Sequence, residues 1–113
     1  MTVPKGLSAV EVAKLHYDLL KESRDKWAET IVKSLREQLK KVRGSSAEFW
    51  YNTGHRYAEK GIHYVFDHID KEEEDYMKIF FKRLDKDGNQ MGLPVPIHLV
   101  KEDGEWRVKM ASY

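Results

Sequence analysis

The sequence contains no cysteine, no long apolar run and no marked excess of one charge. Without thiols the chain forms neither disulfides nor a thiolate nucleophile, which fits a reducing compartment. No stretch approaches the roughly 20 apolar residues that span a bilayer, and the N-terminus lacks an apolar signal-peptide core. The 20 basic and 19 acidic side chains give a net charge of +1, which creates no field that would recruit nucleic acid or a membrane. We expect a cytoplasmic protein, unless it is excised from a longer exported protein, with neither of those partners.

The motifs of common catalytic and metal sites are also missing. There is no phosphate-binding glycine loop, no Gly-x-Ser-x-Gly turn and no His-x-x-x-His helix pair. His63 and His68 are five residues apart, which places them on opposite faces of a strand. The acidic run at residues 72–75 lacks the spacing and the glycine of a calcium loop, so we interpret it as a solvated loop. We therefore predict no catalytic residue, no metal site and no cofactor.

Glycine is sparse, but two of the seven glycines follow aspartate between apolar segments. The pairs Asp87-Gly88 and Asp103-Gly104 are typical of tight hairpin turns. They divide the C-terminal half into an antiparallel meander of four strands, predicted at residues 62–69, 76–84, 91–101 and 105–111. Pro94 and Pro96 lack the amide hydrogens of a regular ladder, so the third strand should bend at residues 92–96.

The N-terminal half has the periodicity of amphipathic helices. Ser8 and Ser45 are each followed three residues later by glutamate, which is the capping-box spacing at a helix start. Gly54 costs up to about 1 kcal/mol inside a helix, so it predicts a close packing partner. We predict three helices, one that begins at Ser8 and others at residues 26–42 and 46–60. The length suits one domain, residues 1–113, of the α+β class, with three helices packed on a bent antiparallel sheet.

Alternation along the strands predicts which side chains face the helices. In the second strand, Met77, Ile79 and Phe81 form an unbroken apolar face. In the first strand, Phe66 and His68 should share a face. In the last strand we expect one face to close the core, with Trp106 as its anchor and with Val108 and Met110 beside it.

The opposite face of the second strand alternates rings with lysines. It carries more aromatic surface than an ordinary solvent-facing sheet, and monomers rarely leave such a patch exposed. A second copy of the chain is the simplest cover, so we predict a homodimer. The candidate interface residues are Tyr76, Phe80, His98 and Val100.

Several polar side chains are candidates for an internal pocket. His16 lies in the middle of the apolar face of the first helix, where a core histidine bonded to a backbone carbonyl is the ordinary interpretation and a ligand or catalytic role is the alternative. Tyr57 has two similar interpretations, a buried ring with a solvated hydroxyl or a polar group in a cavity. The pocket candidates are His16, Trp50, Tyr57, Tyr64 and Asp67.

The layout and the last hairpin resemble a known superfamily. Residues 99–108 read Leu-Val-Lys-Glu-Asp-Gly-Glu-Trp-Arg-Val, which is similar to the closing hairpin of NTF2-like domains with the cystatin-like cone fold, nearest to DUF4878-type and lumazine-binding-like members. The resemblance implies an α+β cone with a pocket between the helices and the concave sheet, and frequent dimerisation through the sheet. It implies no single activity, because the superfamily includes ketosteroid-isomerase-like and SnoaL-like enzymes, transport adaptors and ligand binders. No residue set matches the isomerase pattern of an aspartate base facing a tyrosine and a protonated aspartate, so we carry over no catalytic residue.

Three functions stay open from the sequence. The first is a non-enzymatic domain that binds a small apolar ligand or a protein partner and acts as a dimer. The alternative is an isomerase- or dehydratase-like enzyme with His16 or Asp67 as base and Tyr57 or Tyr64 as hydrogen-bond donor. The third is a purely structural interaction module with a collapsed pocket. Convergence of those polar groups on one cavity would favour the enzyme.

Overall fold

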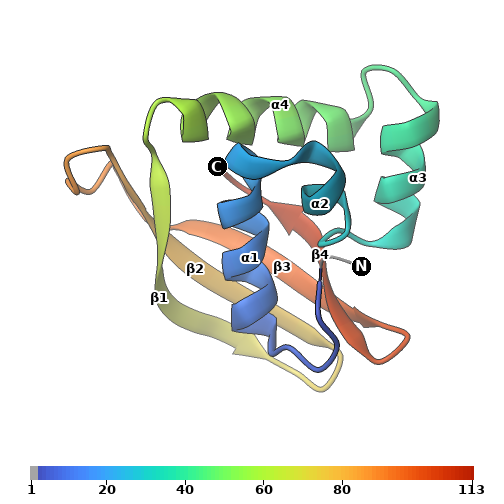
Figure 1. The fold of residues 1–113 in the computed structure, drawn as a ribbon. Coiled ribbons are helices and arrows are strands. Elements are labelled where there is room, and N and C mark those ends of the chain that lie inside the picture. The colour runs from blue at the N-terminus through green and yellow to red at the C-terminus, as the bar shows by residue number, and fades with distance from the viewer. Residues whose placement is uncertain (1–2) are drawn as a thin grey trace.

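The computed structural model describes residues 3–113 and has an α+β fold with all helices on one face of a four-stranded antiparallel meander (Figure 1). The sheet order is β1-β2-β3-β4. None of the described helices has the length and apolar character needed to cross a bilayer. In chain order the elements are α1 Ala9–Glu22, α2 Arg24–Ala28, α3 Lys33–Lys41, α4 Ser46–Glu59, β1 His63–Glu72, β2 Tyr76–Leu84, β3 Val95–Glu102 and β4 Glu105–Ala111.

The capping signals predicted the starts of α1 and α4 correctly. The Ser8 hydroxyl accepts from the Glu11 amide at 3.2 Å, and the Glu11 carboxylate accepts from the Ser8 amide at 2.9 Å. At α4 the Ser45 hydroxyl accepts from the Glu48 amide in the same way, at 3.2 Å. Each side chain satisfies an amide that has no partner within its helix, which fixes where the helix begins.

The prediction of one helix over residues 26–42 is wrong, because the backbone turns at residues 29–30 and is extended at residues 31–32, which separates α2 from α3. This segment forms a parallel bridge with β4 between Ile31 and Val108. The Val108 amide donates to the Thr30 carbonyl at 2.7 Å, and the Val32 amide donates to the Val108 carbonyl at 3.0 Å. Three consecutive β-branched residues favour the extended state, and the pairing satisfies backbone groups on the outer edge of β4.

Helix α3 begins without a local cap, since its N-cap residue is Val32. The Glu102 carboxylate, at the end of β3, takes that role and accepts from the Lys33 amide at 3.0 and 3.2 Å. Arg36 lies 3.7 Å from the same carboxylate. A negative group is favourable at a helix N-terminus, so Glu102 connects α3 to the sheet.

The inner face of the sheet packs against the helices as predicted for β2. Alternate residues of β2 and β3, together with Val108 and Ala111 of β4, are fully or almost fully buried, and α1 lies across them while α4 runs across one end of the sheet (Figure 1). The Asp103-Gly104 pair forms the predicted tight turn with φ values of +55° and +79°, as a type I′ hairpin requires. The buried set comprises Met77, Ile79, Phe81, Ile97, Leu99, Val108 and Ala111.

Irregular pairing corrects the predicted faces of β1. Register shifts occur between Phe66 and His68 and between Ile69 and Lys71. Phe66 therefore pairs with the inward-facing Phe81, whereas His68 pairs with Phe80 on the other face. The predicted common face of Phe66 and His68 is wrong, because each bulge adds a residue and reverses the alternation.

A similar shift in β4 corrects the predicted core face there. Met110 pairs with His98 and Val108 pairs with Leu99, so the alternation reverses between Val108 and Met110. Met110 is consequently 51% exposed. Trp106 is only partly buried at the start of the strand, with the Lys101 ammonium 5.3 Å from its ring centre. The core anchor of β4 is Val108 rather than Trp106.

Candidate functional site

The interior between α1 and the sheet is filled by stacked rings. Tyr17 stacks on Tyr64 with ring centres 4.1 Å apart, and it contacts Phe81 at 5.1 Å and Tyr113 at 5.9 Å. The Tyr17 hydroxyl donates to the Ser112 carbonyl at 3.1 Å. These rings occupy the space in which the resemblance placed a ligand pocket, and they hold the C-terminal segment against α1.

His16 is fully buried in this interior and makes two side-chain hydrogen bonds. Its Nδ1 lies 2.7 Å from Thr30 Oγ1, and its Nε2 lies 2.7 Å from the Tyr113 hydroxyl. Thr30 donates its own hydroxyl hydrogen to the Trp27 carbonyl at 2.7 Å. Thr30 Oγ1 must therefore accept from His16 Nδ1–H, which leaves Nε2 to accept from the Tyr113 hydroxyl. The network assigns a neutral imidazole protonated at Nδ1.

This environment makes His16 a poor base. Burial lowers the pKa of the imidazole from 6.5 to about 3, because the charged form loses its hydration. Both ring nitrogens already have partners inside the protein. The inward direction of His16 agrees with the prediction, but its partners are two hydroxyls rather than a backbone carbonyl.

Three of the other pocket candidates make their contacts away from His16. Asp67 lies in the first bulge of β1, where its carboxylate contacts His68 and lies 3.7 Å from the ammonium of Lys82 on the outer face. The Arg83 guanidinium lies over the Tyr57 ring, 5.3 Å from the ring centre. Trp50 is a partly buried side chain of α4. The structure therefore separates the predicted acid-base groups. A ligand-binding role for any of them stays a prediction.

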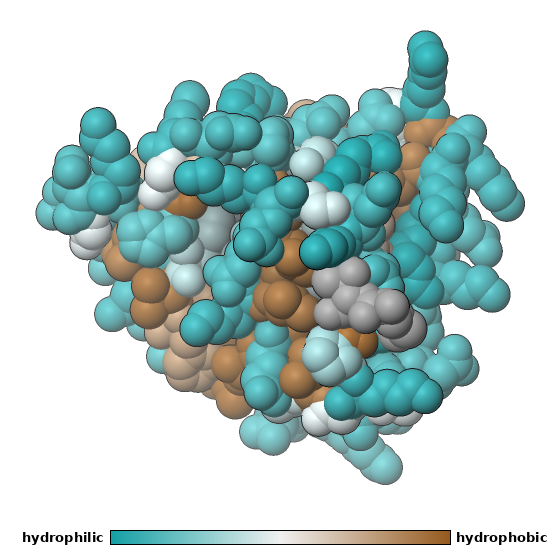
Figure 2. Space-filling view, viewed as in Figure 1, coloured by the Kyte–Doolittle hydropathy of each residue, from teal (hydrophilic) through white to brown (hydrophobic). Residues whose placement is uncertain are grey.

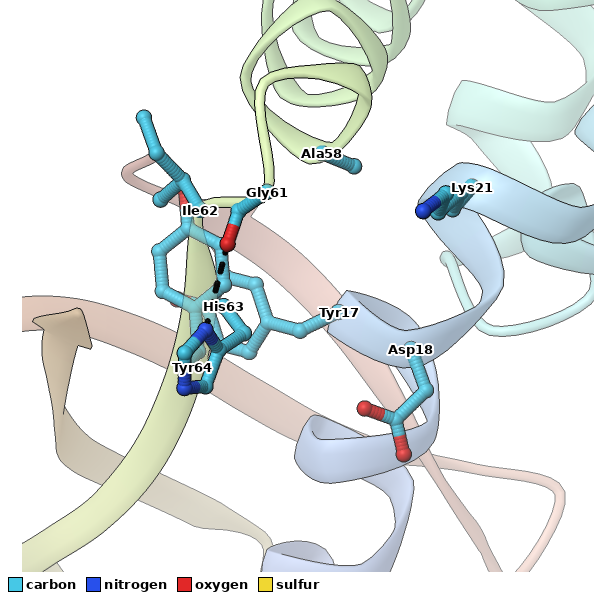
Figure 3. Close-up of a pocket in the computed structure, with 8 residues that line it drawn as sticks. All are labelled: Tyr17, Asp18, Lys21, Ala58, Gly61, Ile62, His63 and Tyr64. Carbon is cyan, nitrogen blue, oxygen red and sulfur yellow. Dashed lines mark hydrogen bonds between the residues drawn. The ribbon is translucent and has the colours of Figure 1, made fainter. Parts of the chain in front are cut away.

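Tyr64 lines a pocket of about 180 Å³ where the C-terminal half of α1, the end of α4 and the start of β1 meet (Figure 3). We call this site the rim pocket. Burial raises the pKa of the Tyr64 phenol to about 12 and raises the pKa of the Asp18 carboxyl, which Lys14 partly opposes. The rim pocket is lined by Tyr17, Asp18, Lys21, Ala58, Gly61, Ile62, His63 and Tyr64.

The four predicted interface residues share the outer face of the sheet, and Val100 borders the start of α3, where it lines a pocket with Val32 and Leu35. Cross-strand pairing places Tyr76 beside Val100, and Phe80 beside Pro96. The Tyr76 hydroxyl lies 2.6 Å from His98 Nδ1. Desolvation, with smaller effects of Lys78 and Lys109, lowers the pKa of His98. The outer face includes four rows of cross-strand neighbours: Val65, Lys82; His68, Phe80, Pro96; Lys71, Lys78, His98, Met110; and Tyr76, Val100, Arg107.

The helix side of the molecule is predominantly hydrophilic, with apolar surface along α1 and the neighbouring part of the sheet (Figure 2). Part of the exposed apolar surface comes from the edge strand β1, where Val65, Phe66 and Ile69 are 39–44% exposed. Within residues 3–113, no group of three histidine, aspartate or glutamate side chains is placed to hold a metal ion.

Comparisons with known proteins support the fold. No family model and no curated protein matches the sequence. Among solved structures, a designed NTF2-like protein, Rd1NTF2_05 in a form with five substitutions, matches with a TM-score of 0.59 and 14% sequence identity. The match covers 93% of this chain and 95% of the designed one. The chain therefore has an NTF2-like fold, as the helix order and the last hairpin predicted.

Sequence reasoning missed three polar residues of the rim pocket. Asp18 and Lys21 lie three residues apart on α1, at the edge of its polar side, where they resemble ordinary solvated charges. His63 begins β1 and was considered only as a metal ligand. The i,i+3 spacing placed Asp18 and Lys21 on one face of α1, but no local pattern indicated that the turn after α4 would lie opposite that face.

Proposed function

We propose that this protein is a non-enzymatic interaction module that acts as a homodimer through the outer face of its sheet. The observation that carries the proposal is the aromatic and aliphatic surface of that face, on the side of the sheet away from the helices (Figure 1). Tyr76, Phe80, His98 and Val100 are each half-buried by their neighbours alone. Apolar area of this kind is stabilised when a second surface removes it from water.

The charges around this surface favour a second copy as the partner. On its β1 side, the Lys78 ammonium lies 3.5 Å from the Asp70 carboxylate, and Lys82 lies 3.7 Å from Asp67. The β1 side of the patch therefore carries both positive and negative charges. A two-fold axis places each patch against its own image, so cations of one copy can approach anions of the other. A standard interface would bury about 800 Å² on each partner.

The isomerase-type alternative has less support. His16 is neutral, buried and bonded at both nitrogens, while Asp67 pairs with Lys82 on the opposite side of the sheet. A general base must reach the substrate proton within hydrogen-bond distance, and the contacts of His16 and Asp67 place these two groups on opposite sides of the sheet. The filled interior likewise favours an interaction module over a domain that encloses a small apolar ligand.

A closer kinship to DUF4878-type and lumazine-binding-like members is also part of this proposal. It rests on the hairpin at residues 99–108, in which the Asp103-Gly104 turn stands between a Val-Lys-acidic run and a Glu-Trp-basic run. A hairpin of this pattern is a common close of those members, and frequent dimerisation through the sheet is what the resemblance implies.

Sedimentation equilibrium on the wild type, Phe80→Glu and Phe49→Glu tests the dimer. Phe80 lies at the centre of the outer face, whereas Phe49 is 66% exposed on α4. We expect a dimeric wild type, an affinity at least about 100-fold lower for Phe80→Glu because a buried unpaired carboxylate is costly, and no change for Phe49→Glu. A monomeric wild type, or equal affinities of the wild type and Phe80→Glu, would contradict the proposal. Circular dichroism verifies that both variants are folded.

A further inference from the structure

The rim pocket lies on the helix side of the sheet, away from the proposed dimer surface, and combines an apolar floor with a charged mouth. Its walls are Ala58 and Ile62, which are 8% and 9% exposed, and the rings of Tyr17 and Tyr64. Asp18 and Lys21 line the pocket from α1, across from Gly61 and the start of β1 (Figure 3). The pocket therefore has apolar walls and charged side chains at its opening.

The two charges at the mouth form no close salt bridge within residues 3–113, although Lys14 acts on Asp18 at longer range. Among residues 3–113, Asp18 and Lys21 form no ion pair with each other or with another side chain, although both line the same pocket. Both side chains are exposed to solvent, as is usual for charges on the surface of a helix. Here one carboxylate and one ammonium lie at the mouth of a concave apolar site, an arrangement complementary to a molecule that carries both charges.

His63 adds a third polar group of defined character. Its Nδ1 lies 3.2 Å from the Gly61 carbonyl (Figure 3), and a carbonyl only accepts, so Nδ1 carries the hydrogen. Nε2 of the neutral ring is then an acceptor. Together with the Asp18 carboxylate, it provides two acceptors for a ligand ammonium, while Lys21 provides the donor for a ligand carboxylate.

The volume limits the size of the ligand. About 180 Å³ is the space of about six water molecules at roughly 30 Å³ each. A branched aliphatic side chain of about four carbons fits this space with its charged groups left at the mouth.

We propose that the rim pocket binds a free α-amino acid with a small branched apolar side chain, with its ammonium at Asp18 and its carboxylate at Lys21. The side chain lies between Ile62 and Ala58 on the Tyr17 ring. The raised pKa of Asp18 has burial as its first cause, and a ligand ammonium would compensate this desolvation. The proposal does not depend on dimerisation.

L-leucine is the probe for the test, and its analogues separate the three elements of recognition. 4-Methylpentanoate lacks the ammonium, 3-methylbutylamine lacks the carboxylate, and glycine lacks the side chain. Amide shifts of the ¹⁵N-labelled full chain report the site through Gly61, His63 and Lys21. We expect a Kd of about 1 mM for L-leucine, and binding at least about tenfold weaker for each of the other three probes.

Two variants and their matched controls connect each charge to its partner. Asp18→Asn should weaken L-leucine at least about tenfold and leave 4-methylpentanoate unchanged, whereas Lys21→Gln should weaken L-leucine and leave 3-methylbutylamine unchanged. Asp25→Asn and Lys26→Gln remove the same charges from exposed positions outside the pocket and should bind L-leucine like the wild type. The proposal is overturned if L-leucine shifts none of the three reporter amides, if an analogue binds as tightly as L-leucine, or if the variants and their controls behave alike.

Discussion

Replacement of His16 should change how the stability of the protein depends on pH. The imidazole is fully buried and its pKa is lowered from 6.5 to about 3. Between these values the unfolded chain binds a proton that the folded chain does not bind, so stability falls as pH falls through this window. At about 1.36 kcal/mol per pH unit, the full window amounts to about 4 to 5 kcal/mol, and the step from about pH 7 to about pH 5 amounts to about 2 kcal/mol.

Urea unfolding of the wild type and His16→Gln at both pH values measures this loss of stability. Glutamine does not titrate, and its amide oxygen can still accept from the Tyr113 hydroxyl. We expect His16→Gln to be less stable at about pH 7, because the network is disturbed, but to lose about 2 kcal/mol less than the wild type between the two pH values. Carboxylates contribute little in this range because their ordinary pKa values lie near 4.

His68→Gln is the control for this experiment, since the His68 side chain is 53% exposed. His98, whose pKa is also lowered, is present in all three proteins, so the difference between them isolates His16. Equal losses of stability in the wild type and His16→Gln would refute the assignment of a neutral, desolvated His16.

Two substitutions test packing and capping. Glu102→Gln removes the carboxylate that caps α3 at Lys33 and approaches Arg36. It should lower the urea-unfolding free energy by about 1 kcal/mol. An unchanged free energy would show that α3 does not need this cap. Gly54→Ala places a methyl 2.7 Å from Leu20 Cδ2 and 3.1 Å from Tyr113 Cδ1, so it should cost about 1 to 3 kcal/mol despite the better helix propensity of alanine. Asn52→Ala on the exposed side of α4 is its control, and a Gly54→Ala protein as stable as that control would contradict the packing.

The parts of the fold that depend on local chemistry could be predicted from the sequence. Ser8, Ser45 and the two Asp-Gly pairs act within a few residues, and each marks a helix start or a turn in the structure. The prediction that Gly54 has a close packing partner is also confirmed, by Leu20 and Tyr113. Such signals need no information about distant segments.

The errors occur where a distant partner determines the backbone. Residues 30–32 continue a helical pattern of apolar residues, but the unpaired edge of β4 competes for their backbone groups. The bulges of β1 and β4 exchange the faces of His68 and Met110 without a proline or glycine to indicate them. For the same reason the rim pocket was missed, since it combines side chains from α1, the end of α4 and the start of β1.

The bonds between the first third of the chain and its last residues also determine the order in which the fold can form. His16 bonds to Tyr113 across 97 positions, Gly6 bonds to Glu105 across 99, and Lys33 bonds to Glu102 across 69. Loops of this length close slowly, because their entropy is lost before the contacts form. During synthesis the apolar face of α1 therefore remains without its final partners until β4 has left the ribosome. The helices emerge first, but the last strand completes the core that buries them.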